Sequence, residues 1–200
     1  MRVYGDSESG NCYKVRLTMA HVGRDYQWVP IDVVAGETRT PEFLAKNPNG
    51  RVPLLELDDG TFLAESNAIL SYLAEDTSLL PAGGIDRAKV YEWLFFEQYS
   101  HEPFIATSRY WIHYLDGRDE YAAKLAEKRE PGYAALGVME QRLAAHDFLA
   151  ADRFTIADIA LYAYTHVADE GDFDLDRFPA ILAWLDRVEA LPAHRPMRPA

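Results

Sequence analysis

The stretch NPNGRVPLLELDDGTFLAESNAILSYL, residues 47–73, decides the fold. Two short apolar runs in it, at 52–57 and 61–64, flank the turn sequence DDG, a pattern typical of a β-hairpin. The residues after the hairpin, 66–76, have the apolar periodicity of an amphipathic helix. The stretch therefore predicts a ββα unit.

The residues before this stretch predict a βαβ unit. Runs at 2–5 and 27–34 are typical of strands, and Pro30 in the second run favours an edge position. Helical spacing is found at 12–23 and, in a shorter pattern, at 40–47. The order β-α-β-α-β-β-α can build one four-stranded mixed sheet with helices on its faces.

The rest of the chain predicts helices only. Proline and glycine in LLPAGGIDRA indicate a linker at 78–86, and Pro103 is expected to kink the aromatic-rich helix that follows. Helices are expected at 87–115, 120–130, 132–146, 156–168 and 178–190. The predicted fold class is α/β plus all-α, with an N-terminal domain at 1–77 and a helical domain at 87–200.

Composition and charge exclude several classes of function. The chain has 20 Lys and Arg against 32 Asp and Glu, a formal net charge of -12, so nucleic acid and anionic membranes are poor partners. With Cys12 as the single cysteine, neither a disulfide framework nor a cysteine-based zinc cluster can form, and no spacing implies another metal site. No signal peptide or membrane-spanning run is present, so a reducing cytoplasm is the expected location.

Ser9-Gly10-Asn11-Cys12 has the frame of a dithiol redox motif in which serine replaces the first cysteine. The motif lies at the start of the helix at 12–23, where backbone N–H groups and the helix dipole favour a thiolate. A serine hydroxyl there could donate a hydrogen bond to a thiolate that a ligand brings. The alternative is that Ser9 only caps the helix.

Two further motifs have a binding and a structural interpretation. A cis Val52–Pro53 bond would expose the backbone of Val52 to a peptide-like ligand, whereas a trans proline would simply open a strand. At the start of the helix at 66–76, Glu65 suits an ammonium group and the helix N-terminus suits a carboxylate, so the pair could hold an α-amino acid end. Alternatively, Ser66 is an ordinary N-cap.

In this order and on this scaffold, the motifs resemble those of the cytosolic glutathione transferases of bacterial type, over essentially all 200 residues. NPNGRVPLLE and ESNAILSYL are the strongest matches, and FTIADIALY, residues 154–162, resembles the capping box of the family's buried helix. The resemblance implies a thioredoxin-like glutathione-binding domain, an all-helical second domain and a homodimer. It also implies that glutathione, as co-substrate, is added to small apolar electrophiles.

Carried over by position, the resemblance implies specific contacts with glutathione. Val52, next to cis Pro53, would hydrogen-bond the backbone of the glutathione cysteine, and Glu65 would hold the γ-glutamyl end. The implied glutathione-binding residues are Thr38, Arg51, Val52, Pro53, Glu65 and Ser66. Thr38 falls where many members of the family carry His or Gln toward the glycyl end, so the chain departs from the family pattern at this contact.

The residue that contacts the thiol is ranked as Ser9, then Asn11, then Cys12. Ser9 matches the serine of theta- and zeta-like members, and the amide of Asn11 could also donate to a thiolate. Cys12 falls within the first helical turn, where a small buried apolar role is the alternative. Tyr4 is a rival in principle but belongs to the strand before the loop.

An aromatic wall for the electrophile is expected on the helix at 87–115. Its candidate residues are Phe96, Tyr99, Tyr110 and Trp111. The same aromatic spacing fits core or dimer contacts. His101 and Glu102, beside Pro103, are candidates for cleft or dimer contacts.

Three other functions fit the same site. Glutathione-dependent isomerisation and reduction of glutathione-containing disulfides both use a glutathione thiolate. A non-catalytic glutathione-binding or assembly module would use the fold alone.

Overall fold

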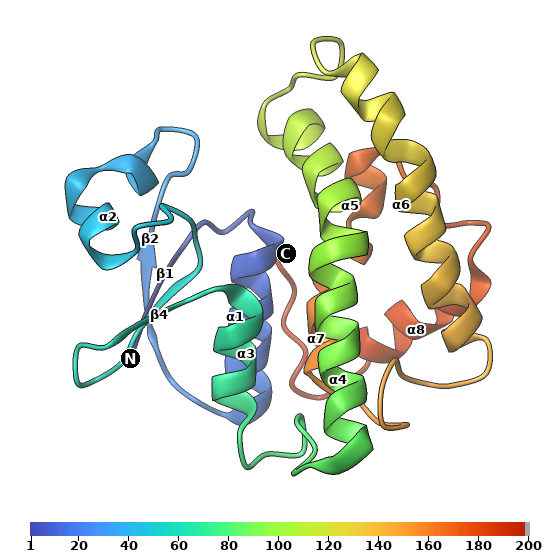
Figure 1. Ribbon diagram of the computed structural model, residues 1–200, viewed down its shortest axis with the longest axis horizontal. Helices are drawn as coiled ribbons and strands as arrows, with labels where there is room; N and C mark the ends of the chain where they lie inside the picture. The colour runs from blue at the N-terminus through green and yellow to red at the C-terminus, as the bar shows by residue number, and fades with distance from the viewer. Residues whose placement is uncertain (199–200) are drawn as a thin grey trace. The chain divides into compact units, whose positions relative to one another are not determined.

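The computed structural model describes residues 1–198, which divide into two units (Figure 1). The first unit comprises residues 1–77 together with the chain from Pro192 onward, and the second comprises 78–191. The sequence placed everything after 86 in the helical domain. In the structure, the segment from Pro192 packs with the first unit instead.

The first unit is a four-stranded mixed sheet with helices on both faces, as the sequence predicted. Its elements are β1 (Arg2–Gly5), α1 (Gly10–Val22), β2 (Gln27–Pro30), α2 (Pro41–Lys46), β3 (Leu54–Glu56), β4 (Phe62–Ala64) and α3 (Ser66–Ala74). The strand order is β2-β1-β3-β4, with β1 and β2 parallel and the other neighbours antiparallel. β2 is an edge strand, which confirms the position that its proline predicted.

The two faces of this sheet are covered by different helices. In Figure 1, α2 lies on one side of the strands and the adjacent helices α1 and α3 lie on the other. Under α2 a small apolar cluster forms from Tyr4, Phe43 and Leu54. The starts of α1 and α3 therefore belong to the face opposite this cluster.

The second strand ends earlier than predicted, at Pro30 instead of residue 34. Side chains bind the backbone that follows it. The Asp32 carboxylate accepts a hydrogen bond from the Ala35 N–H at 2.8 Å, and the Glu37 carboxylate accepts one from the Asp32 N–H at 2.7 Å. Such local bonds turn the chain out of the strand and into a 3₁₀ helix at Glu37–Arg39.

All regular structure of the second unit is helical among the described residues 78–191. Its elements are α4 (Gly84–Phe96), a π-helix (Glu97–His101), α5 (Glu102–Arg109), a second π-helix (Tyr110–Tyr114), α6 (Ala122–Leu143), α7 (Ile156–Thr165), a 3₁₀ helix (Ala168–Gly171) and α8 (Pro179–Glu189). Every residue of α7 is buried, and α4, α5 and α8 pack against it. This helix forms the centre of the unit's core.

The long helix predicted at 87–115 is interrupted by the two π-helical turns, and it begins at Gly84, inside the predicted linker. Pro103 is the second residue after the first π-helix. Because proline has no N–H and its ring crowds the preceding turn, a widened turn here accommodates it without ending the helix.

The prediction of two helices at 120–130 and 132–146 is wrong, since α6 runs through Pro131 without a break. Packing accounts for the difference. Gly132 lies so close to Phe173 that an added Cβ would be 2.4 Å from its ring. A proline inside a helix costs about 3 kcal/mol, and tertiary contacts of this kind can offset that cost.

The capping box at the start of α7 is confirmed. Thr155 Oγ1 accepts a hydrogen bond from the Ala157 N–H at 3.2 Å, and the Asp158 carboxylate accepts one from the Thr155 N–H at 2.9 Å. The helix ends at Thr165, three residues before the predicted end at 168.

Candidate functional site

Ser9 caps α1, which begins at Gly10, two residues earlier than predicted. Its hydroxyl oxygen accepts a hydrogen bond from the Cys12 N–H at 3.3 Å. An accepting hydroxyl still carries its own O–H proton as a donor. Capping and donation to a thiolate are therefore compatible roles for this one side chain.

Cys12 lies in the core and not at the surface. Its side chain is fully buried, and burial raises the pKa of the thiol to about 12, although the hydroxyl of Ser9 lowers it in part. An added Cβ at Gly5 would be 2.9 Å from the sulfur and 2.6 Å from the Trp28 ring, which shows how closely this region is packed. A thiol held in this way is protonated at neutral pH and does not face a ligand.

The starts of α1 and α3 are joined by a hydrogen bond. The Ser66 hydroxyl donates to Oδ1 of Asn11 at 3.1 Å. The expectation that Ser66 is an N-cap is wrong, because α3 begins at Ser66 itself and residue 65 occupies the cap position. With Oδ1 accepting from Ser66, the end of the Asn11 amide that could donate to a thiolate is Nδ2.

Glu65 has an unusual backbone conformation at that cap position. Its φ of 67° and ψ of 115° lie in a region that glycine favours, and its side chain makes no capping hydrogen bond. Holding a residue other than glycine there costs about 1–3 kcal/mol. The residue is exposed at the start of α3, and Nδ2 of Asn49 donates to its Oε1 at 3.4 Å.

The Val52–Pro53 peptide bond is cis, as the binding interpretation of the motif required. The sheet register of β3 begins at Leu54, so Val52 lies outside the paired part of the strand. An internal hydrogen bond stabilises the preceding loop, residues 47–51: Nδ2 of Asn47 donates to the Arg51 carbonyl at 2.8 Å. The side chain of Arg51 itself is exposed.

Thr38 is placed differently from the other predicted glutathione contacts. Its side chain is almost fully buried within the 3₁₀ helix at Glu37–Arg39, so it does not face solvent. The exposed neighbour Arg39 donates to the Asn49 carbonyl at 3.2 Å. Sequence reasoning missed Arg39 and Asn49, because only the folded loop at 47–51 brings Asn49 to Glu65 and Arg39 to the Asn49 carbonyl.

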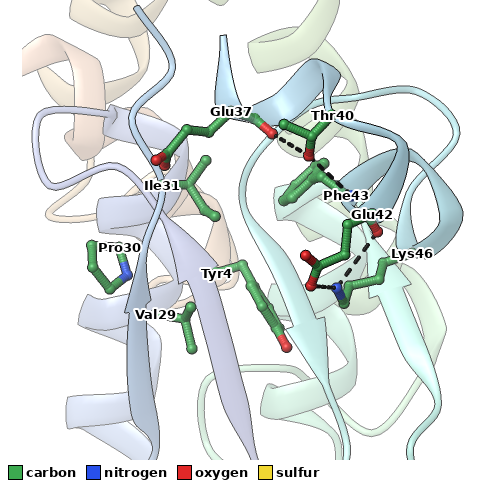
Figure 2. A pocket seen from close by; sticks show the side chains of 9 residues that line it. All are labelled: Tyr4, Val29, Pro30, Ile31, Glu37, Thr40, Glu42, Phe43 and Lys46. Atoms are coloured by element: carbon green, nitrogen blue, oxygen red, sulfur yellow. Dashed lines mark hydrogen bonds and ion pairs between the residues drawn. The ribbon is translucent and has the colours of Figure 1, made fainter. Parts of the chain in front are cut away.

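The structure separates Tyr4 from the start of α1. Its hydroxyl donates to Oε2 of Glu56 at 2.6 Å, and its ring belongs to the cluster under α2. A cavity of about 310 Å³ lies there, and the ion pair of Lys46 with Glu42 stands beside it (Figure 2). Ser9 caps a helix on the opposite face of the sheet, so the candidate thiol-contacting residues do not include Tyr4.

The four aromatic residues predicted to line the electrophile site have different partners within the second unit. Phe96 packs edge-on against Trp93, with ring centroids 5.2 Å apart, and Tyr110 lies 5.4 Å from Tyr114. Trp111 stacks on Tyr121 at 5.0 Å. Tyr99 is 85% exposed, so it contributes little to the unit's own core.

His101 is an internal residue and not the cleft or dimer contact that its place beside Pro103 suggested. It is fully buried, and its Nε2 lies 3.0 Å from Oγ1 of Thr165. The π-helix that ends at this residue turns it toward the buried helix α7.

Residues 1–198 contain no group of three or more His, Cys, Asp or Glu side chains arranged to hold a metal ion. Across the same part of the chain, no helix has both the length and the apolar character needed to cross a bilayer.

Comparison with known proteins agrees with this architecture. The first unit is thioredoxin-like and has a cis-proline loop, and an all-helical unit follows it. Family models for the N-terminal and C-terminal domains of glutathione S-transferase match residues 1–75 and 93–192. The chain belongs to the glutathione S-transferase family.

Individual relatives cover nearly the whole chain. The maleylacetoacetate isomerase of Pseudomonas aeruginosa is 31% identical over 210 residues, covering 100% of this chain and 96% of that protein. The disulfide-bond oxidoreductase YfcG of Escherichia coli is 29% identical over 190 residues, covering 92% and 87%. The crystal structure of a glutathione S-transferase from Pseudomonas fluorescens Pf-5 superposes with a TM-score of 0.96 at 51% identity, covering 98% of each chain. Ure2p in complex with glutathione superposes with a TM-score of 0.84 at 26% identity, covering 96% and 95%.

Proposed function

We propose that this protein is a glutathione transferase that binds glutathione on its first unit, stabilises the thiolate and adds it to small apolar electrophiles. The observation that carries the proposal is Glu65, an exposed carboxylate in a strained backbone conformation at the start of α3. A helix cap alone has no need of that strain, and strained residues are concentrated at binding sites. Together the carboxylate and the N–H groups of α3 offer a partner to each charge of a γ-glutamyl end.

The other proposed contacts are with successive parts of an extended glutathione molecule. The main chain of Val52 would pair with the backbone of the glutathione cysteine beside cis Pro53, and Ser66 would assist at the γ-glutamyl end. Arg51, with its exposed side chain, would lie near the tripeptide. The buried Thr38 would contribute at most through its backbone, and the exposed Arg39 is the better placed cation toward the glycyl carboxylate.

We assign thiol activation to Ser9, which gives the protein a serine-type first loop, with Asn11 as the second donor. A free thiol with a pKa near 8.5 is only a few per cent ionised at pH 7, so a fall of about two units makes most of it nucleophilic. The hydroxyl already accepts from the Cys12 N–H, and that bond holds it in place as a donor. The thiol proton leaves to solvent, and a sulfur lone pair then forms the bond to the electrophilic carbon. In a displacement the leaving group departs with its bonding electron pair, and in an addition to a double bond the π electron pair moves to the neighbouring atom, which takes a proton from solvent.

The second substrate, the homodimer and the location are further parts of the proposal. Phe96, Tyr99, Tyr110 and Trp111 would provide the apolar wall for the electrophile. The largely exposed Ile85 and Phe95 on α4 suit contact with a second copy of the chain. A cytoplasmic location fits a protein whose single cysteine is buried and forms no disulfide bond.

A pH titration of the thiolate ultraviolet absorbance of glutathione, with and without the protein, tests this function. Bound glutathione should titrate well below its free pKa. Ser9→Ala should lower turnover with a model electrophile by about 10²- to 10³-fold, and it should affect glutathione affinity much less. Ser7→Ala, an exposed serine of the same loop, is the matched control and should behave as the native protein. Equal activity of Ser9→Ala and the native protein would refute the role of Ser9, and absence of glutathione binding would refute the function.

Glutathione-dependent isomerisation is the second candidate, because a relative that matches the whole chain is named a maleylacetoacetate isomerase. In that reaction the same thiolate adds to the substrate and leaves again. Disulfide reduction is the third candidate, supported by the name of the relative from Escherichia coli. Because the Cys12 thiol is buried with a raised pKa, this route would exchange glutathione thiols alone, and Cys12→Ser should leave it intact. A non-catalytic binding module would bind glutathione without lowering its thiol pKa.

A further inference from the structure

The C-terminal segment, defined here as residues 192–198, returns to the first unit after the last helix. By its contacts it belongs with residues 1–77 and not with the helical unit that precedes it. In Figure 1 this last part of the chain runs beside α1.

Three contacts fix the segment along the first turns of α1. The buried Tyr13 hydroxyl donates to the Arg195 carbonyl at 2.7 Å, and Nη1 of Arg16 donates to the Met197 carbonyl at 3.0 Å. At its end, Arg198 pairs with Glu8, whose Oε2 lies 2.8 Å from Nε and 2.6 Å from Nη2. The segment is thus bound at three of its last four residues.

The partner of Arg198 lies directly before Ser9 in the chain. The Glu8 N–H donates to Oδ1 of Asp6 at 2.8 Å, and the Ser9 N–H donates to the carbonyl of Asp6 at 3.2 Å. These bonds form the tight turn that presents Ser9 as the cap of α1. A displacement of Glu8 therefore shifts the backbone of this turn, and with it the position of the Ser9 hydroxyl.

The segment is not packed as part of the core along its whole length. A cavity of about 460 Å³ lies between it, the loop before α1, and β2, with Ser7, Trp28 and Met197 among the residues that line it. The Met197 side chain is itself buried and anchors the segment, whereas the attachment of Arg198 near Ser9 depends on polar contacts. Such an attachment can be altered by substitution without removing a large apolar surface.

We propose that the C-terminal segment is a positioning element for the glutathione site, with Glu8 and Arg198 as positioning residues for Ser9. This inference rests on the proposed function of Ser9. The pair holds the loop before α1 in the one conformation that directs the Ser9 hydroxyl to the thiol. Because both side chains are more than one third exposed, the effect of the pair alone is modest, and release of the whole segment has a larger effect.

A double-mutant cycle tests the pair. Glu8→Gln and Arg198→Gln should each raise hydrogen–deuterium exchange in residues 6–17 about two- to fivefold without any ligand. Each should lower kcat by a similar factor with KM for glutathione nearly unchanged, and the double variant should be no worse than either single one. Arg24→Gln, an exposed arginine after the end of α1, is the matched control and should change neither quantity. A chain ending at Leu191 should show the same changes more strongly.

Each outcome has a distinct meaning. If the native protein binds no glutathione, or binds it without lowering its thiol pKa, the proposed function fails and this inference fails with it. If the native protein activates glutathione, three results would overturn this inference alone: unchanged exchange in both single variants, additive effects in the double variant, or faster exchange with unchanged kcat. The last result would mean that the segment is structural only. Arg24→Gln with an effect equal to that of Arg198→Gln would also overturn it, since net charge would then be the cause.

Discussion

Replacing Glu65 with glycine should make the protein more stable and a poorer binder of glutathione. The residue is held at φ 67° and ψ 115°, a conformation that costs about 1–3 kcal/mol for any side chain other than glycine. Glycine removes that strain but loses about 0.5–1 kcal/mol through the greater freedom of its unfolded chain. The net gain is about 1 kcal/mol, which raises Tm by about 2–4 °C in a protein of this size.

Glutathione affinity should change in the opposite direction. The carboxylate of Glu65 is the proposed partner of the γ-glutamyl ammonium group, and a hydrogen bond between charged groups contributes about 1.5–3 kcal/mol. Its loss corresponds to a rise in Kd of about 10- to 100-fold.

Glu65→Gln separates the two effects, because it keeps a side chain in the strained conformation and removes only the charge. It should leave Tm almost unchanged and weaken glutathione binding about as much as glycine does. Thermal unfolding measures stability, and isothermal titration calorimetry with glutathione measures affinity. A fall in Tm for Glu65→Gly would show that the backbone conformation carries no strain. Native affinity in Glu65→Gln would remove Glu65 from the binding site.

Two further predictions concern stability. Asp158→Ala removes a fully buried carboxylate that accepts hydrogen bonds from two backbone N–H groups, a hydroxyl and an indole N–H. Because buried donors are left without acceptors, urea unfolding should show a loss of about 3–5 kcal/mol, whereas the exposed control Asp25→Ala should differ little from the native protein. For His21, burial and the nearby His194 and Arg195 lower the pKa to about 4 in the folded state. Between pH 4 and the ordinary pKa of 6.5, His21 binds more protons in the unfolded chain than in the folded protein. The contribution of neutral, buried His21 to the free energy of unfolding is therefore complete above about pH 6.5 and is lost as the pH falls toward 4. His21→Gln should flatten the dependence of the urea midpoint on pH across this window, and an unchanged dependence would exclude His21 as its source.

The sequence alone determined the order of elements in the first unit and the type of each domain. The turn sequence DDG, the glycine after α1 and the capping box at Thr155 and Asp158 act through bonds between near neighbours in the chain, so their effect can be read without the fold. Proline positions were less informative. Pro30 predicted an edge strand, whereas Pro131 predicted a helix break that is absent because packing around Gly132 holds the backbone helical.

The candidate site was predictable in part. Its residues were found by motif, but their relations depend on contacts between residues far apart in the chain. The hydrogen bond from Ser66 to Asn11 joins two helix ends, a contact that neither motif predicts by itself. The approach of Asn49 to Glu65 likewise has no signal in spacing or periodicity.

The sequence by itself determined a β-α-β-α-β-β-α unit, a helical second half and the serine, proline and glutamate motifs, because each of these depends on local propensity and short-range bonds. Only the tertiary structure decided that Cys12 is buried with a raised pKa, that Tyr4 faces the opposite side of the sheet from Ser9, and that the chain from Pro192 returns to the first unit. The burial of Cys12, the side of the sheet that Tyr4 faces and the path of the C-terminal segment all depend on which elements pack together. Packing depends on the whole molecule and not on any single stretch of its sequence.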